Sequence, residues 1–153
     1  ITTFLALLSR TASSPEIQYE IPGFLQTVTA LEHVGDRCED VLDGIIARKE
    51  AGVIFSDEAM SDLKYLVIAV GEVVTVTEDT VRNNRALDPE RLHEIKRNTR
   101  ACFDRAKQSH FDRISSGTCQ PQGMLLFNDM SAAFLRIAEE CWGILGMRIR
   151  GVE

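Results

Sequence analysis

The chain has 153 residues, of which 44% are hydrophobic and 26% are charged, and its formal net charge is -6 at pH 7. This size and composition are typical of one globular domain, and the negative charge argues against nucleic-acid binding, which requires a basic face. The most apolar run, residues 65–77, is too short to span a bilayer and contains Glu72. We therefore expect no nucleic-acid partner and no membrane-spanning segment.

Helical periodicity and helix-end signals cover nearly the whole chain. Residues 1–10 resemble the last turns of a truncated helix, residues 13–16 indicate a turn or a helix restart, and Pro22 suits the first turn of the next helix. Two further starts are marked by capping residues, Ser56 and Asp88. The expected helices are 1–10, 22–49, 57–84, 89–116 and 124–150. Because their connections are short, we predict an all-α, antiparallel up-and-down helical bundle.

Four cysteines are scattered along the chain, without a C-x-x-C pair or a histidine at zinc-finger spacing: Cys38, Cys102, Cys119 and Cys141. Three of them fall on apolar helix positions, where a free cysteine packs as a small hydrophobic residue. We interpret them as reduced thiols of a cytoplasmic protein. The chain also begins within a helical pattern and without methionine, so we expect a fragment of a longer protein.

The helix after Pro22 carries a row of carboxylates beside an apolar stripe. Glu32, Asp36 and Asp40 are four residues apart, so their side chains stack along one ridge of the helix. Like charges in this register repel by roughly 0.2–0.5 kcal/mol per pair, and only Arg37 is placed to relieve them, through Asp40. A bound cation would compensate, and a solvated acidic face is the alternative. The stripe, which we expect to face the core, consists of Leu31, Val34, Cys38, Val41, Leu42, Ile45 and Ile46.

Other chemical signals are weaker. Asp129 is a candidate ligand but reads better as a surface carboxylate, and His33 beside the ridge reads as a solvent-facing histidine. Glu90 and His93 have the Glu-x-x-His form of di-iron bundles, which use two such copies where this chain has one. The helix over 89–116 has a basic face, which we interpret as solvated: Arg91, Lys96, Arg97, Arg100, Arg105 and Lys107.

A faint internal repeat is present. Segment 31–41, LEHVGDRCEDV, follows a polar loop, and segment 134–139, FLRIAE, follows another. Segment 31–41 resembles the signature of PhoU-domain proteins, whose tandem three-helix repeats carry a Glu-x-x-x-Asp-x-x-x-Asn/Asp ridge. In the second copy Leu135 replaces the first carboxylate, Glu139 stands for the aspartate and Gly143 replaces the last ligand. The resemblance therefore implies one intact motif and one degraded motif.

The resemblance implies a PhoU-like domain whose first repeat is truncated. Residues 1–55 would be the end of that repeat, and residues 56–153 the second repeat. It also implies multinuclear iron or zinc on Glu32, Asp36 and Asp40, the hard oxygen ligands that such ions accept.

On this basis we expect a regulatory or interaction module of phosphate transport and not an enzyme. It would be the cytoplasmic domain of a sodium/phosphate cotransporter-like protein, with the transporter domain of the same chain or a phosphate-signalling protein as partner, and a homodimer is left open. The alternatives are a free-standing PhoU-type regulator of phosphate uptake and a carboxylate-bridged metalloenzyme bundle.

Overall fold

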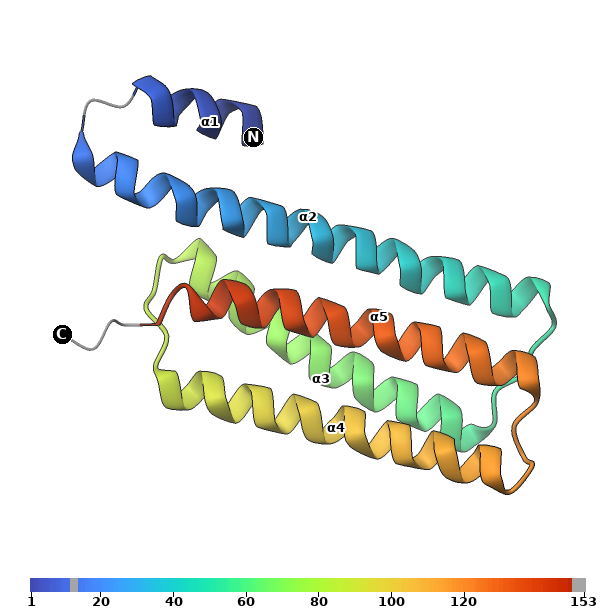
Figure 1. The fold of residues 1–153 in the computed structure, drawn as a ribbon. Coiled ribbons are helices and arrows are strands. Elements are labelled where there is room, and N and C mark those ends of the chain that lie inside the picture. Colours follow the sequence, from blue (N-terminus) through green and yellow to red (C-terminus); the bar gives the residue numbers. More distant parts are fainter. Residues whose placement is uncertain (12–13, 150–153) are drawn as a thin grey trace.

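The computed structural model describes residues 1–11 and 14–149, and this part of the chain is an all-α helical bundle (Figure 1). Five helices account for most of it: α1 (Thr2–Thr11), α2 (Pro15–Glu50), α3 (Asp57–Arg82), α4 (Pro89–Ser115) and α5 (Pro121–Gly146). Short links join the four long helices at alternate ends of the bundle. None of the helices in the described ranges is both long and apolar enough to cross a membrane.

Side-chain caps set the starts of α3 and α4, as the sequence predicts. The Ser56 side chain accepts a hydrogen bond from the Ala59 N–H at 3.3 Å. The Asp88 carboxylate accepts one from the Glu90 N–H at 3.0 Å. Each cap satisfies a backbone donor that the first helical turn leaves without a partner.

The prediction that the second long helix begins at Pro22 is wrong. α2 begins at Pro15, whose fixed backbone suits a first helical position, and Pro22 lies inside the helix. An interior proline removes a backbone donor and costs about 3 kcal/mol. Ile21, immediately before it, is only 3% exposed, and this burial favours continuing the helix through the proline.

The expected bounds of the last helix are also wrong. α5 begins at Pro121, three residues before the expected start, and ends at Gly146. Beyond it the chain turns to meet the link between α3 and α4. There the Leu87 N–H donates to the Arg148 carbonyl at 2.8 Å, and the Arg148 side chain donates to the Asn84 side-chain oxygen at 2.6 Å. Residue 150, the expected last helical residue, lies outside the described ranges.

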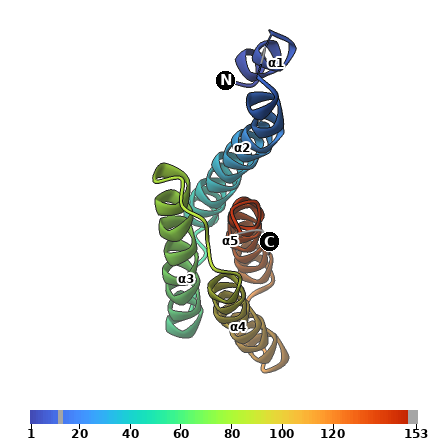
Figure 2. The same cartoon turned by 90° about the vertical axis from the view of Figure 1, so that its left-hand side faces the viewer.

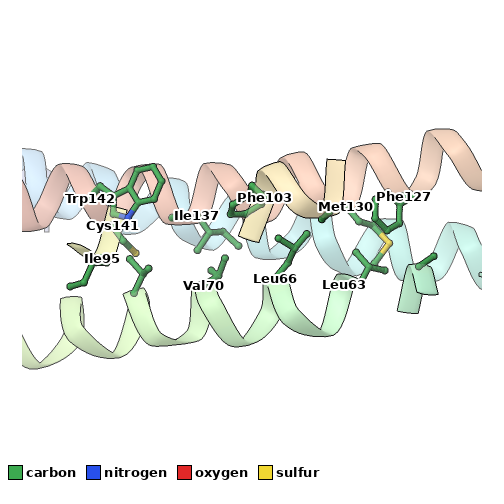
Figure 3. Close-up of a cluster of buried hydrophobic side chains, with 14 of the residues drawn as sticks. Leu63, Leu66, Val70, Ile95, Phe103, Phe127, Met130, Ile137, Cys141 and Trp142 are labelled. Atoms are coloured by element: carbon green, nitrogen blue, oxygen red, sulfur yellow. The ribbon is translucent and has the colours of Figure 1, made fainter. Parts of the chain in front are cut away.

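The hydrophobic core lies among α3, α4 and α5, which all contact one another. Figure 3 shows α3 and α5 side chains meeting in this core, with Leu66 and Val70 on one side and Ile137 on the other. The largest side chains with almost no exposure belong to α3 and α5: Leu66, Val73, Ile144 and Leu145.

α2 lies against this three-helix core on one side only. Its backbone packs closely against α5 and α1 and does not approach the backbone of α3 or α4 in the described ranges, and Figure 2 shows its first turns and α1 projecting away from the other helices. Of the apolar stripe expected to face the core, only Val34 and Val41 pack against it. The expectation is wrong for the rest, because a helix with one long neighbour buries only a narrow face. The exposed members are Leu31, Cys38, Leu42, Ile45 and Ile46.

Candidate functional site

The carboxylate ridge lies in solvent on α2. Glu32, Asp36 and Asp40 are all exposed, and Arg37 donates to the Asp40 carboxylate at 2.6 Å, which confirms the expected relief of the ridge. Among the described residues, no three His, Cys, Asp or Glu side chains gather closely enough to hold a metal ion. Metal binding at the ridge stays a prediction from the resemblance.

The other polar candidates are His33, beside the ridge on α2, and Asp129, Glu90 and His93, on other helices. His33 pairs across to α5, with its Nδ1 atom 3.2 Å from a Glu140 carboxylate oxygen. Asp129, Glu90 and His93 are exposed, which for Asp129 agrees with its interpretation as a surface carboxylate.

The degraded second motif is partly buried: Leu135 packs against the core and Ile137 and Ala138 are buried, whereas Glu139 and Gly143 are exposed. Glu139 lies 3.7 Å from the Arg100 guanidinium. The Arg100 guanidinium lies 5.8 Å from the centroid of the Trp142 ring. Arg100, one of the residues of the basic face of α4, is therefore paired with residues of α5.

An apolar groove of about 810 Å³ runs between α2 and α3, with α5 at its floor. Its walls include Ile45 of α2 and Val67 and Ile68 of α3, which are 48%, 50% and 50% exposed. The α2–α3 link closes one end with Ile54, which is 92% exposed. Contiguous exposed apolar surface of this kind marks interaction sites in soluble proteins.

A glycine allows α2 to approach the floor of the groove. A Cβ atom at Gly44 would lie 2.7 Å from the Met130 side chain, too close for any real contact. Gly44 therefore lets α2 sit directly on Met130 of α5, which together with Phe134 lines the groove. Sequence reasoning missed the groove, because it assigned the stripe of α2 to the core.

The rim of the groove is basic at the end near the α2–α3 link. Arg48, Lys49 and Lys64 line it there. Arg48 also lies over the Phe55 ring, 4.9 Å from its centroid, and donates to the Met60 sulfur at 3.2 Å. The two lysines are exposed. A ligand for this surface would combine an apolar face with negative charge at one edge.

A second polar cluster is buried beside the same link. Arg113 of α4 donates from one nitrogen, Nη1, to the Asp62 carboxylate at 2.7 Å and to the Ser109 hydroxyl at 2.6 Å. The side chains of Arg113 and Asp62 are 10% and 12% exposed. His110 stacks on the Phe127 ring with centroids 4.5 Å apart. Breaking one side of such a buried pair leaves an uncompensated charge.

Burial sets the protonation of His110. Desolvation, followed by the nearby Arg113 charge, lowers the pKa of His110 from its usual 6.5, and a hydrogen bond to the Met124 backbone and the Asp62 charge oppose the shift. The imidazole is therefore neutral at pH 7. One signal of this cluster is visible in the sequence: the cationic Arg113 lies three residues after His110, next to an otherwise apolar stripe.

Comparison with protein-family models, curated proteins and solved structures finds no match for this chain.

Proposed function

We propose that this chain is a regulatory interaction module that binds one amphipathic helix of a partner protein. The supporting observation is the groove between α2 and α3, whose apolar walls are about half exposed. Laying the apolar face of a helix into an apolar groove is a common mode of peptide recognition. Such a helix would cover the exposed stripe of α2 and give that helix the neighbour on the α3 side that it lacks.

The charges around the groove select among amphipathic helices. Arg48, Lys49 and Lys64 form a cationic rim at one end. Opposite charge across an interface raises the association rate and penalises wrong partners. The helix that fits the groove therefore carries acidic residues at the edge that meets this rim.

The resemblance of segment 31–41 to PhoU domains supports the proposal that this module acts in phosphate transport. On that reading the bundle has PhoU-like tandem repeats, divided at about residue 55 and arranged up and down. The partner is the transporter domain of the same chain, at the cytoplasmic face of the membrane, or a phosphate-signalling protein. A free-standing regulator of phosphate uptake is the alternative. The proposal assigns no catalytic role and does not depend on metal.

A pair of designed peptides tests the docking proposal. One is a helical peptide with Leu and Ile in heptad spacing and glutamates along its edge, and the other is identical except that lysines replace the glutamates. Fluorescence anisotropy should show that the acidic peptide binds and that the basic peptide binds about tenfold or more weakly, as expected for opposed charges at a rim. Ile45→Asp, which places a charge on the groove wall, should abolish binding.

The matched control is Leu125→Asp, because Leu125 is an apolar residue of α5 that is 68% exposed and lies away from the groove lining. This variant should bind like the wild type. Equal loss in both variants, or equal binding of the two peptides, contradicts the proposal. A stable dimer that Ile45→Asp dissociates would instead make a second copy of the chain the occupant.

A further inference from the structure

A small, half-enclosed pocket lies where the α2–α3 and α4–α5 links meet, at one end of the bundle (Figure 1). Its volume is about 210 Å³. Apolar residues, including Phe55 and Phe127, form part of its wall, and His110, Arg113 and Thr118 also line it. Pockets for drug-sized molecules usually measure about 300–1,000 Å³. This pocket suits a smaller ligand.

Arg113 brings donors that the protein leaves without a partner. Its Nη1 atom is bound to Asp62 and Ser109, but Nε and Nη2 are buried and have no hydrogen-bond partner within the described ranges. The residue is nine-tenths buried, at 9% exposure. A guanidinium offers its donors in a fixed fork that matches the oxygens of phosphate and carboxylate groups.

His110 adds a second polar group of the same kind. It is also 9% exposed, and its Nδ1 atom is buried without a partner among the described residues. Nδ1 of a neutral imidazole either donates or accepts one hydrogen bond, depending on the tautomer. A ligand that carries both an O–H group and negatively charged oxygens satisfies His110 in either tautomer while it accepts from Arg113.

The first turn of α5 completes the wall of the pocket. Gln120 precedes this helix, and its side chain makes no capping hydrogen bond. Because Pro121 at the first helical position has no N–H, the backbone donors that this missing cap leaves in the first turn are those of Gln122 and Gly123. Helix N-termini bind anions through these N–H groups and the helix dipole. Gly123, in this first turn, lines the pocket and presents no side chain to it.

We propose that this pocket binds free inorganic phosphate in its hydrogen phosphate form. Hydrogen phosphate carries both negatively charged oxygens and an O–H group. Its oxygens can accept hydrogen bonds from the Arg113 guanidinium and from the α5 N-terminus while the ion also forms a hydrogen bond with His110. Asp62 and Glu58 are the nearby acids. Asp62 is already paired with Arg113. Hydrogen bonds from the backbone and from the Ser56 side chain lower the pKa of the exposed Glu58 carboxyl, and the nearby Arg113 charge adds to this shift. The site would make the module a direct sensor of phosphate.

An NMR titration of the whole chain tests this site. Inorganic phosphate, added at constant ionic strength against chloride, should produce saturable shifts of the amide signals around residues 110–123, with a dissociation constant on the order of 1 mM. Gly123→Ala should weaken binding about tenfold, because its methyl group occupies the pocket. That methyl group would lie 3.5 Å from Val53 and 4.0 Å from both Cys119 and Phe55, which are ordinary contacts, so the fold is retained.

The matched control is Gly143→Ala, on the same helix but with open space around the added methyl group. It should bind phosphate like the wild type. Arg113→Lys, which keeps the charge near Asp62 but removes the guanidinium fork, should weaken binding as Gly123→Ala does. Unchanged affinity in both pocket variants, or absence of saturable shifts in the wild type, overturns the proposal.

A third arm replaces phosphate with O-phosphoserine, which carries the same group on a larger molecule. Binding of phosphoserine without binding of inorganic phosphate would overturn the assignment to the free ion. The inference goes beyond the docking proposal and fails separately from it, because Ile45→Asp should abolish peptide binding and leave phosphate binding unchanged.

Discussion

α2 and α5 are both long helices with apolar residues at helical spacing, yet the structure uses them differently. α5 contacts α2, α3 and α4, and ten of its residues are buried. α2 contacts α5 and α1, and several of its large apolar residues stay about half exposed. The number of neighbouring helices therefore decides whether an amphipathic pattern becomes core or surface. Exposed apolar surface on α2 is the feature from which the docking proposal follows.

The largest difference in unfolding free energy should be found between alanine substitutions at apolar residues of the two helices. Leu145 on α5 has no exposure, and Leu42 on α2 is 57% exposed. Leu145→Ala should lower the free energy of unfolding by about 2–5 kcal/mol, because it leaves a cavity in the core. Leu42→Ala should lower it by less than about 1 kcal/mol, since most of its side chain already contacts water. Urea unfolding measures both values, and similar losses would mean that α2 is buried in solution.

The second-largest difference should be between the contributions that two ion pairs, one buried and one on α2, make to stability. Asp62→Ala leaves Arg113 buried without its partner and should lower the free energy of unfolding by about 2–3 kcal/mol. Asp40→Ala removes a pair in which Arg37 and Asp40 are 29% and 48% exposed, and should change it by no more than about 0.5 kcal/mol. Equal effects would show that the Asp62–Arg113 pair is as solvated as the one on α2.

A feature of the fold or of the candidate site could be predicted from the sequence when the residues that determine it lie close together along the chain. The starts of α3 and α4 follow from Ser56 and Asp88, because a cap acts within one helical turn. The face that α2 buries depends on which helices surround it, and its periodicity carries no such information. The pocket at His110 and Arg113 depends on two links that are far apart in sequence and meet only in the fold.

The pH dependence of stability should come from inside the bundle. Because burial lowers the pKa of His110, the unfolded chain binds a proton more readily than the folded protein, and stability should fall as the pH drops below 6.5. His110→Phe keeps a ring against Phe127 and should flatten this dependence. Urea midpoints measured in phosphate-free buffer between pH 5 and pH 8 give the comparison. The same slope in wild type and variant would assign the titration to other groups.

The smallest effect concerns the exposed ridge of α2. In chelator-treated protein, Asp36→Asn should raise the free energy of unfolding by about 0.2–0.5 kcal/mol, because it relieves repulsion from the neighbouring carboxylates. The resemblance to PhoU domains predicts that with added zinc or iron the wild type becomes more stable than the Asp36→Asn variant, since the metal would stabilise only the wild type. If the order is unchanged with either metal, the ridge is a solvated acidic face.

Hydrogen exchange measured by mass spectrometry compares α2 and α5 in a single experiment. We expect strong protection of α5 amides in the free protein and weak protection over residues 38–50, where α2 lacks a neighbour on its α3 side. Adding the acidic amphipathic peptide should raise protection over residues 38–50 and 60–68, the two walls of the groove. Unchanged exchange on both walls, or new protection confined to the basic face of α4, would contradict the account.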